Sequence, residues 1–138
     1  MNALCEAVKT YGPLVGRILL ALIFLISGYH KVGGFSNVAT AMAGKGIPFP
    51  EVALAVTIFI EIGGGLMLIA GWKARWAAAV LFLWLIPVTA LFHNFWAVEA
   101  AQYQNQFNHF LKNLCIMGGM LYIMAFGAGP FSVDNRKS

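Results

Sequence analysis

Apolar residues are concentrated in four long runs, which polar or glycine-rich segments separate. The runs cover approximately residues 14–29, 52–70, 76–92 and 114–126. One helical crossing of a bilayer needs about 20 mainly apolar residues, because each residue advances the helix by about 1.5 Å. The pattern therefore predicts four membrane-spanning helices, at residues 13–30, 51–70, 74–93 and 108–126. The segments between them are expected to be loops, and residues 134–138 a frayed tail.

The composition agrees with a membrane protein. Sixty per cent of the residues are hydrophobic and only 10% are charged, whereas a typical soluble domain is about 25% charged. The mean hydropathy is +0.77. One bundle of four helices uses the whole length, so we expect residues 1–138 to form a single domain. Its predicted fold class is all-α, an antiparallel four-helix bundle whose first partner is the lipid bilayer.

The basic side chains predict how the bundle is oriented. If all four runs cross the membrane, one side holds both termini and the turn at residues 71–75. That side carries Lys9, Lys73, Arg75, Arg136 and Lys137, with Arg17 just inside. The opposite side carries Lys31, Lys45 and Lys112. The positive-inside rule then places both termini in the cytoplasm, and the scattered positions of the basic residues do not indicate a nucleic-acid partner.

Two charged residues lie inside the apolar runs, Arg17 in the first and Glu61 in the second. Charge within a bilayer is costly unless it is paired or faces the bundle interior. We expect the two residues to differ in depth by about 9 Å, which an arginine side chain largely covers. The sequence therefore predicts an ion pair of Arg17 with Glu61 that fixes the register of the first two helices. In a second interpretation, Glu61 accepts protons or ligand hydrogen bonds.

A second polar group is predicted on the membrane side opposite the termini. Lys31 ends the first helix and His93 ends the third. On the fourth helix His109 and Asn113 are four residues apart, and Lys112 lies on a neighbouring row. Ammonium and imidazole groups suit an anion or a polarised carbonyl, such as a quinone head group, so we predict these five residues as ligand-binding. The alternative is that each is an interfacial residue satisfied by water or by backbone.

The sequence does not indicate a metal site or a catalytic motif. It contains no HExxH, CxxC or CxxCH motif, and its three histidines lie on three different segments. A haem held by two histidines is disfavoured, because their predicted depth is the membrane interface. There is also no glycine-rich phosphate loop and no Ser-His-Asp arrangement worth proposing. The sequence thus leaves open whether the protein is an enzyme and which cofactor it uses, with a quinone as one candidate.

Taken together, the short motifs resemble the DoxX family of small four-helix bacterial membrane proteins, and its YphA-type branch in particular. The resemblance rests on RILL at 17–20, SGYHK at 27–31, GIPFP at 46–50, Glu61, GWKAR at 71–75, HNFW at 93–96 and FNHFLKN at 107–113. It implies a multi-pass protein of the bacterial inner membrane. It also implies a link to membrane redox chemistry, since the family includes the small subunit of a thiosulfate:quinone oxidoreductase. The family offers no agreed catalytic set to carry over.

The favoured hypothesis is a membrane redox component that binds a quinone or similar small molecule in a polar, outward-facing cavity. A first alternative is a non-enzymatic membrane scaffold for partner redox subunits. A second is a transporter of small molecules or lipids. Redox subunits and further copies of the same chain are the candidate protein partners.

Overall fold

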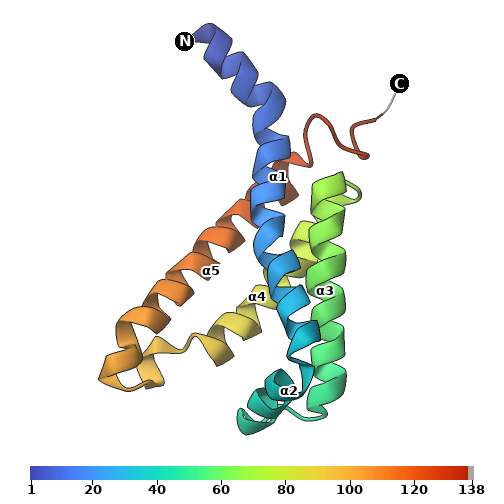
Figure 1. Cartoon of the computed structure of the whole chain (residues 1–138). Helices are drawn as coiled ribbons and strands as arrows, with labels where there is room; N and C mark the ends of the chain where they lie inside the picture. Colours follow the sequence, from blue (N-terminus) through green and yellow to red (C-terminus); the bar gives the residue numbers. More distant parts are fainter. Residues whose placement is uncertain (137–138) are drawn as a thin grey trace.

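The computed structural model describes residues 1–136, and its regular secondary structure is helical (Figure 1). The elements are α1 (Asn2–Gly33), α2 (Phe35–Gly44), α3 (Pro50–Ala70), α4 (Ala74–Phe92), η1 (Phe95–Ala97) and α5 (Ala100–Phe126). Four of these helices, α1, α3, α4 and α5, are long and apolar enough to cross a membrane. The predicted all-α fold with four spanning helices is confirmed.

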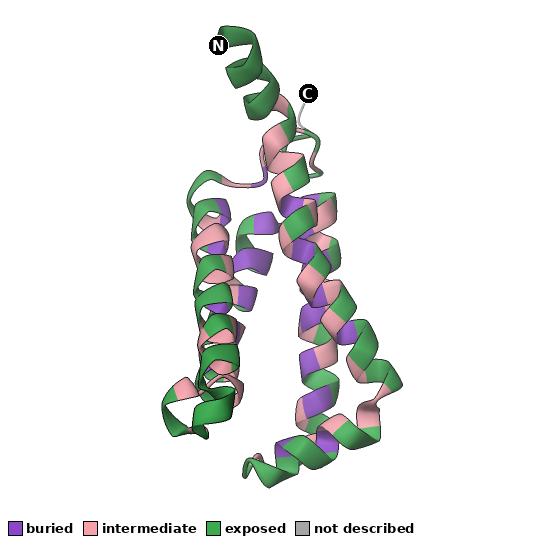
Figure 2. Cartoon of the chain, turned by 60° about the vertical axis from the view of Figure 1, so that its left-hand side comes forward, coloured by how far each residue is buried: buried purple, intermediate pink, exposed green. Residues whose placement is uncertain are grey.

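The start of α1 and the segment that follows α5 lie at the same end of the bundle (Figure 1). We call this the terminal end, and it also holds the turn between α3 and α4. The opposite end holds α2 and η1, and we call it the α2 end. Helix α1 packs mainly against α3, and α4 packs mainly against α5. In both views these two pairs lie closest together toward the terminal end and diverge toward the α2 end (Figures 1 and 2).

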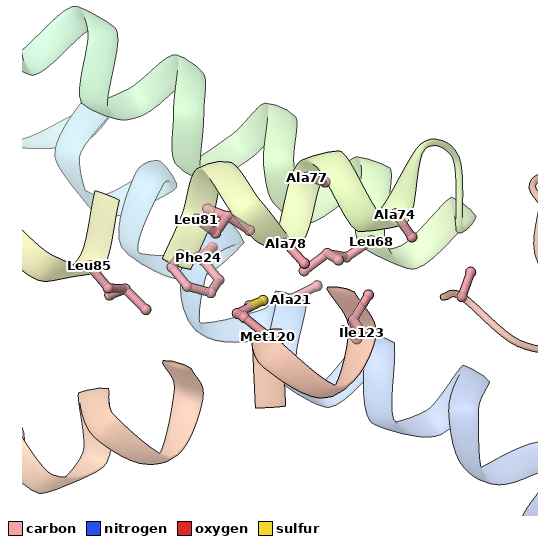
Figure 3. Close-up of a cluster of buried hydrophobic side chains, with 11 residues drawn as sticks. Ala21, Phe24, Leu68, Ala74, Ala77, Ala78, Leu81, Leu85, Met120 and Ile123 are labelled. Carbon is pink, nitrogen blue, oxygen red and sulfur yellow. The ribbon is translucent and has the colours of Figure 1, made fainter. Parts of the chain in front are cut away.

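The main hydrophobic core receives side chains from all four spanning helices. Ala21 of α1, Leu68 of α3, Leu81 of α4 and Met120 of α5 are fully buried and converge on one another (Figure 3). Large apolar side chains also cover the outside of the helices. Because lipid rather than water surrounds such helices, their association depends on close packing and not on hiding apolar surface.

Glycines set the register between α1 and α3. A Cβ at Gly28 would lie 2.6 Å from Cγ1 of Ile62, and one at Gly65 would lie 2.9 Å from Cδ2 of Leu25. Only glycine allows the two backbones to approach this closely. The two helices are antiparallel, so Gly28 near the end of α1 lies beside Ile62, while Leu25, one turn earlier in α1, lies beside Gly65, one turn later in α3.

Two predicted loops are largely helical in the structure. Helix α2 forms within the first loop because Ala39 and Met42 lie on one face and pack against Leu54 of α3. Helix α5 begins at Ala100 rather than 108, since its polar first turns contain no residue that breaks a helix. Helix α1 likewise begins at Asn2 instead of 13 and continues through Pro13.

The segment after α5 folds back onto the turn between α3 and α4. The backbone N–H groups of Val133 and Asp134 donate to the carbonyls of Ala70 (3.0 Å) and Gly71 (2.9 Å). The expectation of a frayed tail from residue 134 onward is therefore wrong for Asp134, while Lys137 and Ser138 lie outside the described residues.

Candidate functional site

Glu61 of α3 is buried and forms an ion pair with Lys31 of α1. The Nζ atom of Lys31 lies 2.9 Å and 3.0 Å from the two carboxylate oxygens, and it also donates to the hydroxyl of Ser27. The side chains of Lys31 and Glu61 are 24% and 7% exposed. A carboxylate and an ammonium inside a bundle offset each other's cost when they are hydrogen-bonded in this way.

Arg17 is also buried, but its partners are backbone carbonyls. Its Nη1 atom donates to the carbonyls of Leu68 (2.9 Å) and Ile69 (2.8 Å), near the end of α3. Its Nη2 atom donates to the carbonyls of Pro130 (3.2 Å) and Phe131 (2.8 Å), in the segment after α5. The last carbonyls of a helix lack partners within it and carry partial negative charge, so a guanidinium satisfies them well.

The predicted pair of Arg17 with Glu61 is therefore wrong. The register of α1 and α3 explains the difference, because Arg17 lies beside Leu68 whereas Glu61 lies beside Gly28. Lys31 is one turn beyond Gly28 and reaches the carboxylate instead.

At the α2 end, the structure brings His93 and His109 together. Their rings are stacked, with centroids 5.0 Å apart and an interplanar angle of 24°. Nζ of Lys112 lies 3.1 Å from Nδ1 of His109. Nδ1 of His93 lies 3.0 Å from Oε1 of Gln106, a residue that the sequence did not single out. His93, His109 and Lys112, three of the five predicted ligand-binding residues, thus form one contact group. We call its two stacked rings the imidazole pair.

The contacts at Nδ1 predict which nitrogen of each neutral ring carries the proton. The Lys112 ammonium can only donate, so Nδ1 of His109 accepts and its Nε2 carries the hydrogen. The carbonyl oxygen of Gln106 can only accept, so Nδ1 of His93 donates and its Nε2 has a lone pair. Within residues 1–136, neither Nε2 atom makes a hydrogen bond to the protein. The pair therefore offers a ligand one donor and one acceptor.

The other two predicted residues have different surroundings. Asn113 is buried between α4 and α5, where its amide donates to the hydroxyl of Thr89 over 3.0 Å. It lies one turn from His109 and fixes α5 against α4. Lys31 makes its contacts with Ser27 and Glu61 and with none of the residues of the imidazole pair.

A group of aromatic rings lies beside the imidazole pair along the chain. The ring of Phe95, in η1, has edge-to-face contacts with Trp96, Tyr103, Phe107 and Phe110 at centroid distances of 4.9–5.5 Å. Tyr103, Phe107 and Phe110 follow one face of α5 at spacings of four and three residues. The sequence analysis did not single out this group, although that spacing could have indicated it. Within residues 1–136, no three His, Cys, Asp or Glu side chains are grouped so as to hold a metal ion.

Four antiparallel spanning helices with an internal Lys31–Glu61 pair define a small polytopic membrane protein. The model of the DoxX family matches residues 12–94, more than half of the chain, and the protein belongs to this family. The matched range includes Arg17, Lys31, Glu61 and His93 and ends before α5.

Three relatives resemble the chain over nearly its whole length. Inner membrane protein YphA of Escherichia coli is 28% identical over 89% of this chain and 88% of its own length. Inner membrane protein YqjF of the same organism is 32% identical over 96% of this chain and 98% of its own length. A Surfeit locus protein 4 homolog of Schizosaccharomyces pombe is 32% identical over 94% of this chain but only 38% of its own length. No solved structure matches the chain.

The two bacterial relatives are inner membrane proteins, as their names state. Together with the four spanning helices, they confirm the predicted localisation of the chain as a multi-pass membrane protein of the inner membrane.

Proposed function

We propose that this DoxX-family protein is a membrane redox component that binds a quinone, or a similar small aromatic carbonyl compound, at His93, His109 and Lys112. The observation that carries the proposal is the stacked imidazole pair, in which the two Nδ1 atoms have partners of opposite kind. Inner-membrane localisation supports it as well, because quinones dissolve in that membrane.

The donor and the acceptor suit both oxidation states of such a ligand. A quinone carbonyl accepts from Nε2–H of His109, with the Lys112 ammonium close by to favour negative charge on that oxygen. A quinol hydroxyl donates to Nε2 of His93. Hydrogen bonds of these kinds contribute about 1 kcal/mol each, and more when one partner is charged.

The surroundings favour an aromatic ligand over a small inorganic anion. The aromatic group around Phe95 lies next to the imidazole pair in the chain, and its rings offer faces and edges for stacking. His93 follows the end of α4 and His109 lies in the third turn of α5, and both are half-buried, so part of each ring is open to a ligand.

In this proposal the chain supplies the binding site and a partner redox subunit supplies the electrons. Reduction of the quinone to the quinol takes two electrons from that subunit and two protons from water. Asn113 positions α5, and the Lys31–Glu61 pair holds α1 against α3. The terminal end carries more basic residues than the α2 end, which supports termini in the cytoplasm. The imidazole pair then lies toward the opposite face of the membrane.

Binding is tested with a soluble short-chain quinone added to the purified protein in nanodiscs, followed through quenching of tryptophan fluorescence. We expect His109→Ala to weaken binding by about tenfold, which corresponds to about 1.4 kcal/mol. His30→Ala is the matched control. His30 lies at the same end of the bundle but is exposed and outside the contact group, so this variant should bind as the parent protein does.

Equal binding by the parent, His109→Ala and His30→Ala proteins would contradict the proposal. If partner subunits nevertheless stay bound to the purified protein, the non-enzymatic scaffold would be the favoured function. Flux of a small molecule into proteoliposomes that Glu61→Gln abolishes would favour the transporter.

A further inference from the structure

A cavity of about 400 Å³ lies at the terminal end, at the opposite end of the bundle from the imidazole pair. It is lined by Lys73, Arg75, Trp76, Phe126, Gly127, Asp134 and Asn135. These residues come from the start of α4, the end of α5 and the segment that folds back after it. No part of the proposed quinone site contributes to this cavity.

The cavity contains two cations for one carboxylate. Asp134 uses both carboxylate oxygens on the first backbone N–H groups of α4, at 2.7 Å from the nitrogen of Lys73 and 2.8 Å from that of Ala74. Within residues 1–136, neither the Lys73 ammonium nor the Arg75 guanidinium forms an ion pair. Asp134 thus caps the helix. The Lys73 ammonium lies over the Trp72 ring, 5.2 Å from its centroid, a contact that does not neutralise its charge, so both positive charges remain available to an anionic ligand.

The guanidinium of Arg75 is held over the backbone of Gly127. A Cβ at this glycine would lie 3.2 Å from Nε and 3.3 Å from Nη2 of Arg75, and its φ of +81° is one that glycine adopts without strain. The planar fork of a guanidinium matches two oxygens of a phosphate group, and Lys73 adds a second positive charge beside it.

The apolar part of the lining distinguishes a lipid from a free anion. Trp76 and Phe126 belong to membrane-spanning helices, and their side chains are 74% and 77% exposed. Both are aromatic residues at helix ends, where such side chains lie at the level of the lipid headgroups. Cations beside exposed aromatic rings at this depth match a headgroup together with the first part of its acyl chains.

We propose that Lys73 and Arg75 bind the phosphate of an anionic phospholipid whose acyl chains lie against Trp76 and Phe126. Basic pockets between spanning helices are suited to such headgroups. A zwitterionic lipid carries its own ammonium, which competes with the two side chains for the phosphate. The site therefore prefers phosphatidylglycerol to phosphatidylethanolamine with the same acyl chains.

Native mass spectrometry of the full chain in detergent, with each lipid added in turn, tests this preference. We expect phosphatidylglycerol to bind at least tenfold more tightly than phosphatidylethanolamine. The double variant Lys73→Gln/Arg75→Gln should lose the preference. The control Lys9→Gln/Lys45→Gln removes the same charge from exposed positions outside the cavity, and it should keep the preference.

Three results would overturn the proposal. The first is equal binding of the two lipids, and the second is an equal loss of preference in the control, which would show diffuse attraction to net charge. The third is displacement of phosphatidylglycerol by millimolar inorganic phosphate, which would show a site for free anions. Should the double variant fail to fold, the single variant Arg75→Gln takes its place in the same measurement. It removes the guanidinium of the cavity and should lose most of the preference for phosphatidylglycerol.

Discussion

The ammonium of Lys31 and the carboxylate of Glu61 meet between α1 and α3, with both carboxylate oxygens within 3.0 Å of Nζ. The contacts between α1 and α3 next to this pair are apolar, such as that of Gly28 with Ile62. Removing one partner leaves the other charge largely buried without compensation, whereas removing both leaves no unpaired charge at this point of the interface.

We therefore expect Glu61→Ala to lower the stability of the bundle by about 1.5–3 kcal/mol, the value of a hydrogen bond to a charged group. The double variant Lys31→Met/Glu61→Met should recover most of that loss. Thermal unfolding in detergent micelles measures both. A double variant less stable than Glu61→Ala would show that the pair itself, and not the relief of an unpaired charge, stabilises the protein.

The guanidinium of Arg17 joins the end of α3 to the segment after α5 through four carbonyls. A lysine carries its donors on one atom, so it cannot reach both sets. Arg17→Lys should release this segment, and hydrogen exchange at the amides of Val133 and Asp134 should accelerate by at least tenfold. Lys9→Met, on the exposed part of α1, is the control and should leave exchange at both amides unchanged. Unaltered exchange in Arg17→Lys would mean that the segment is held by its backbone contacts alone.

The sequence predicted the four spanning helices because each contains an apolar run of 13 to 19 residues, a large part of the roughly 20 that one crossing needs, and this signal does not depend on tertiary contacts. It also predicted that His93 and His109 lie near each other, since both are placed at the same membrane face by helix length alone. The start of α1 and the helix α2 were missed, because capping and a ten-residue amphipathic pattern are weak signals.

The partners of Arg17 could not be predicted from the sequence, because they are backbone carbonyls, which every residue type carries. The depth of Glu61 was estimated from the ends of the runs, and the true register depends on the contact of Gly28 with Ile62. In that register Arg17 lies beside Leu68, about two helical turns beyond Glu61, so Lys31 is the cation that reaches the carboxylate.

The register contact itself can be tested with a methyl group. Gly28→Ala places a Cβ 2.6 Å from Cγ1 of Ile62, so either the Ile62 side chain must move or α1 and α3 must separate, and we expect a loss of stability of about 1–3 kcal/mol. Gly16→Ala is the matched control in the same helix, because nothing lies within 4 Å of the place that its Cβ would occupy. It should be neutral or slightly stabilising, since alanine favours helix over glycine.

Combining Gly28→Ala with Ile62→Ala should restore part of the lost stability by removing the atoms that the new methyl group meets. Equal melting temperatures for the Gly28→Ala and Gly16→Ala proteins would contradict close packing of the two helices at this point.

The opposite tautomers of His93 and His109 are the last prediction, and they can be measured without any ligand. Nitrogen-15 NMR of the imidazoles at about pH 9, where histidine is neutral, should show the proton of His93 on Nδ1 and that of His109 on Nε2. Gln106→Leu removes the acceptor of His93 and should leave that ring as a mixture of tautomers, with His109 unchanged. Gln106→Glu retains an acceptor and should keep the parent pattern. The same tautomer on both rings in the parent protein would remove the donor and acceptor on which the proposed quinone site depends. In that case the stacking of the two rings would reflect only the packing of α4 against α5.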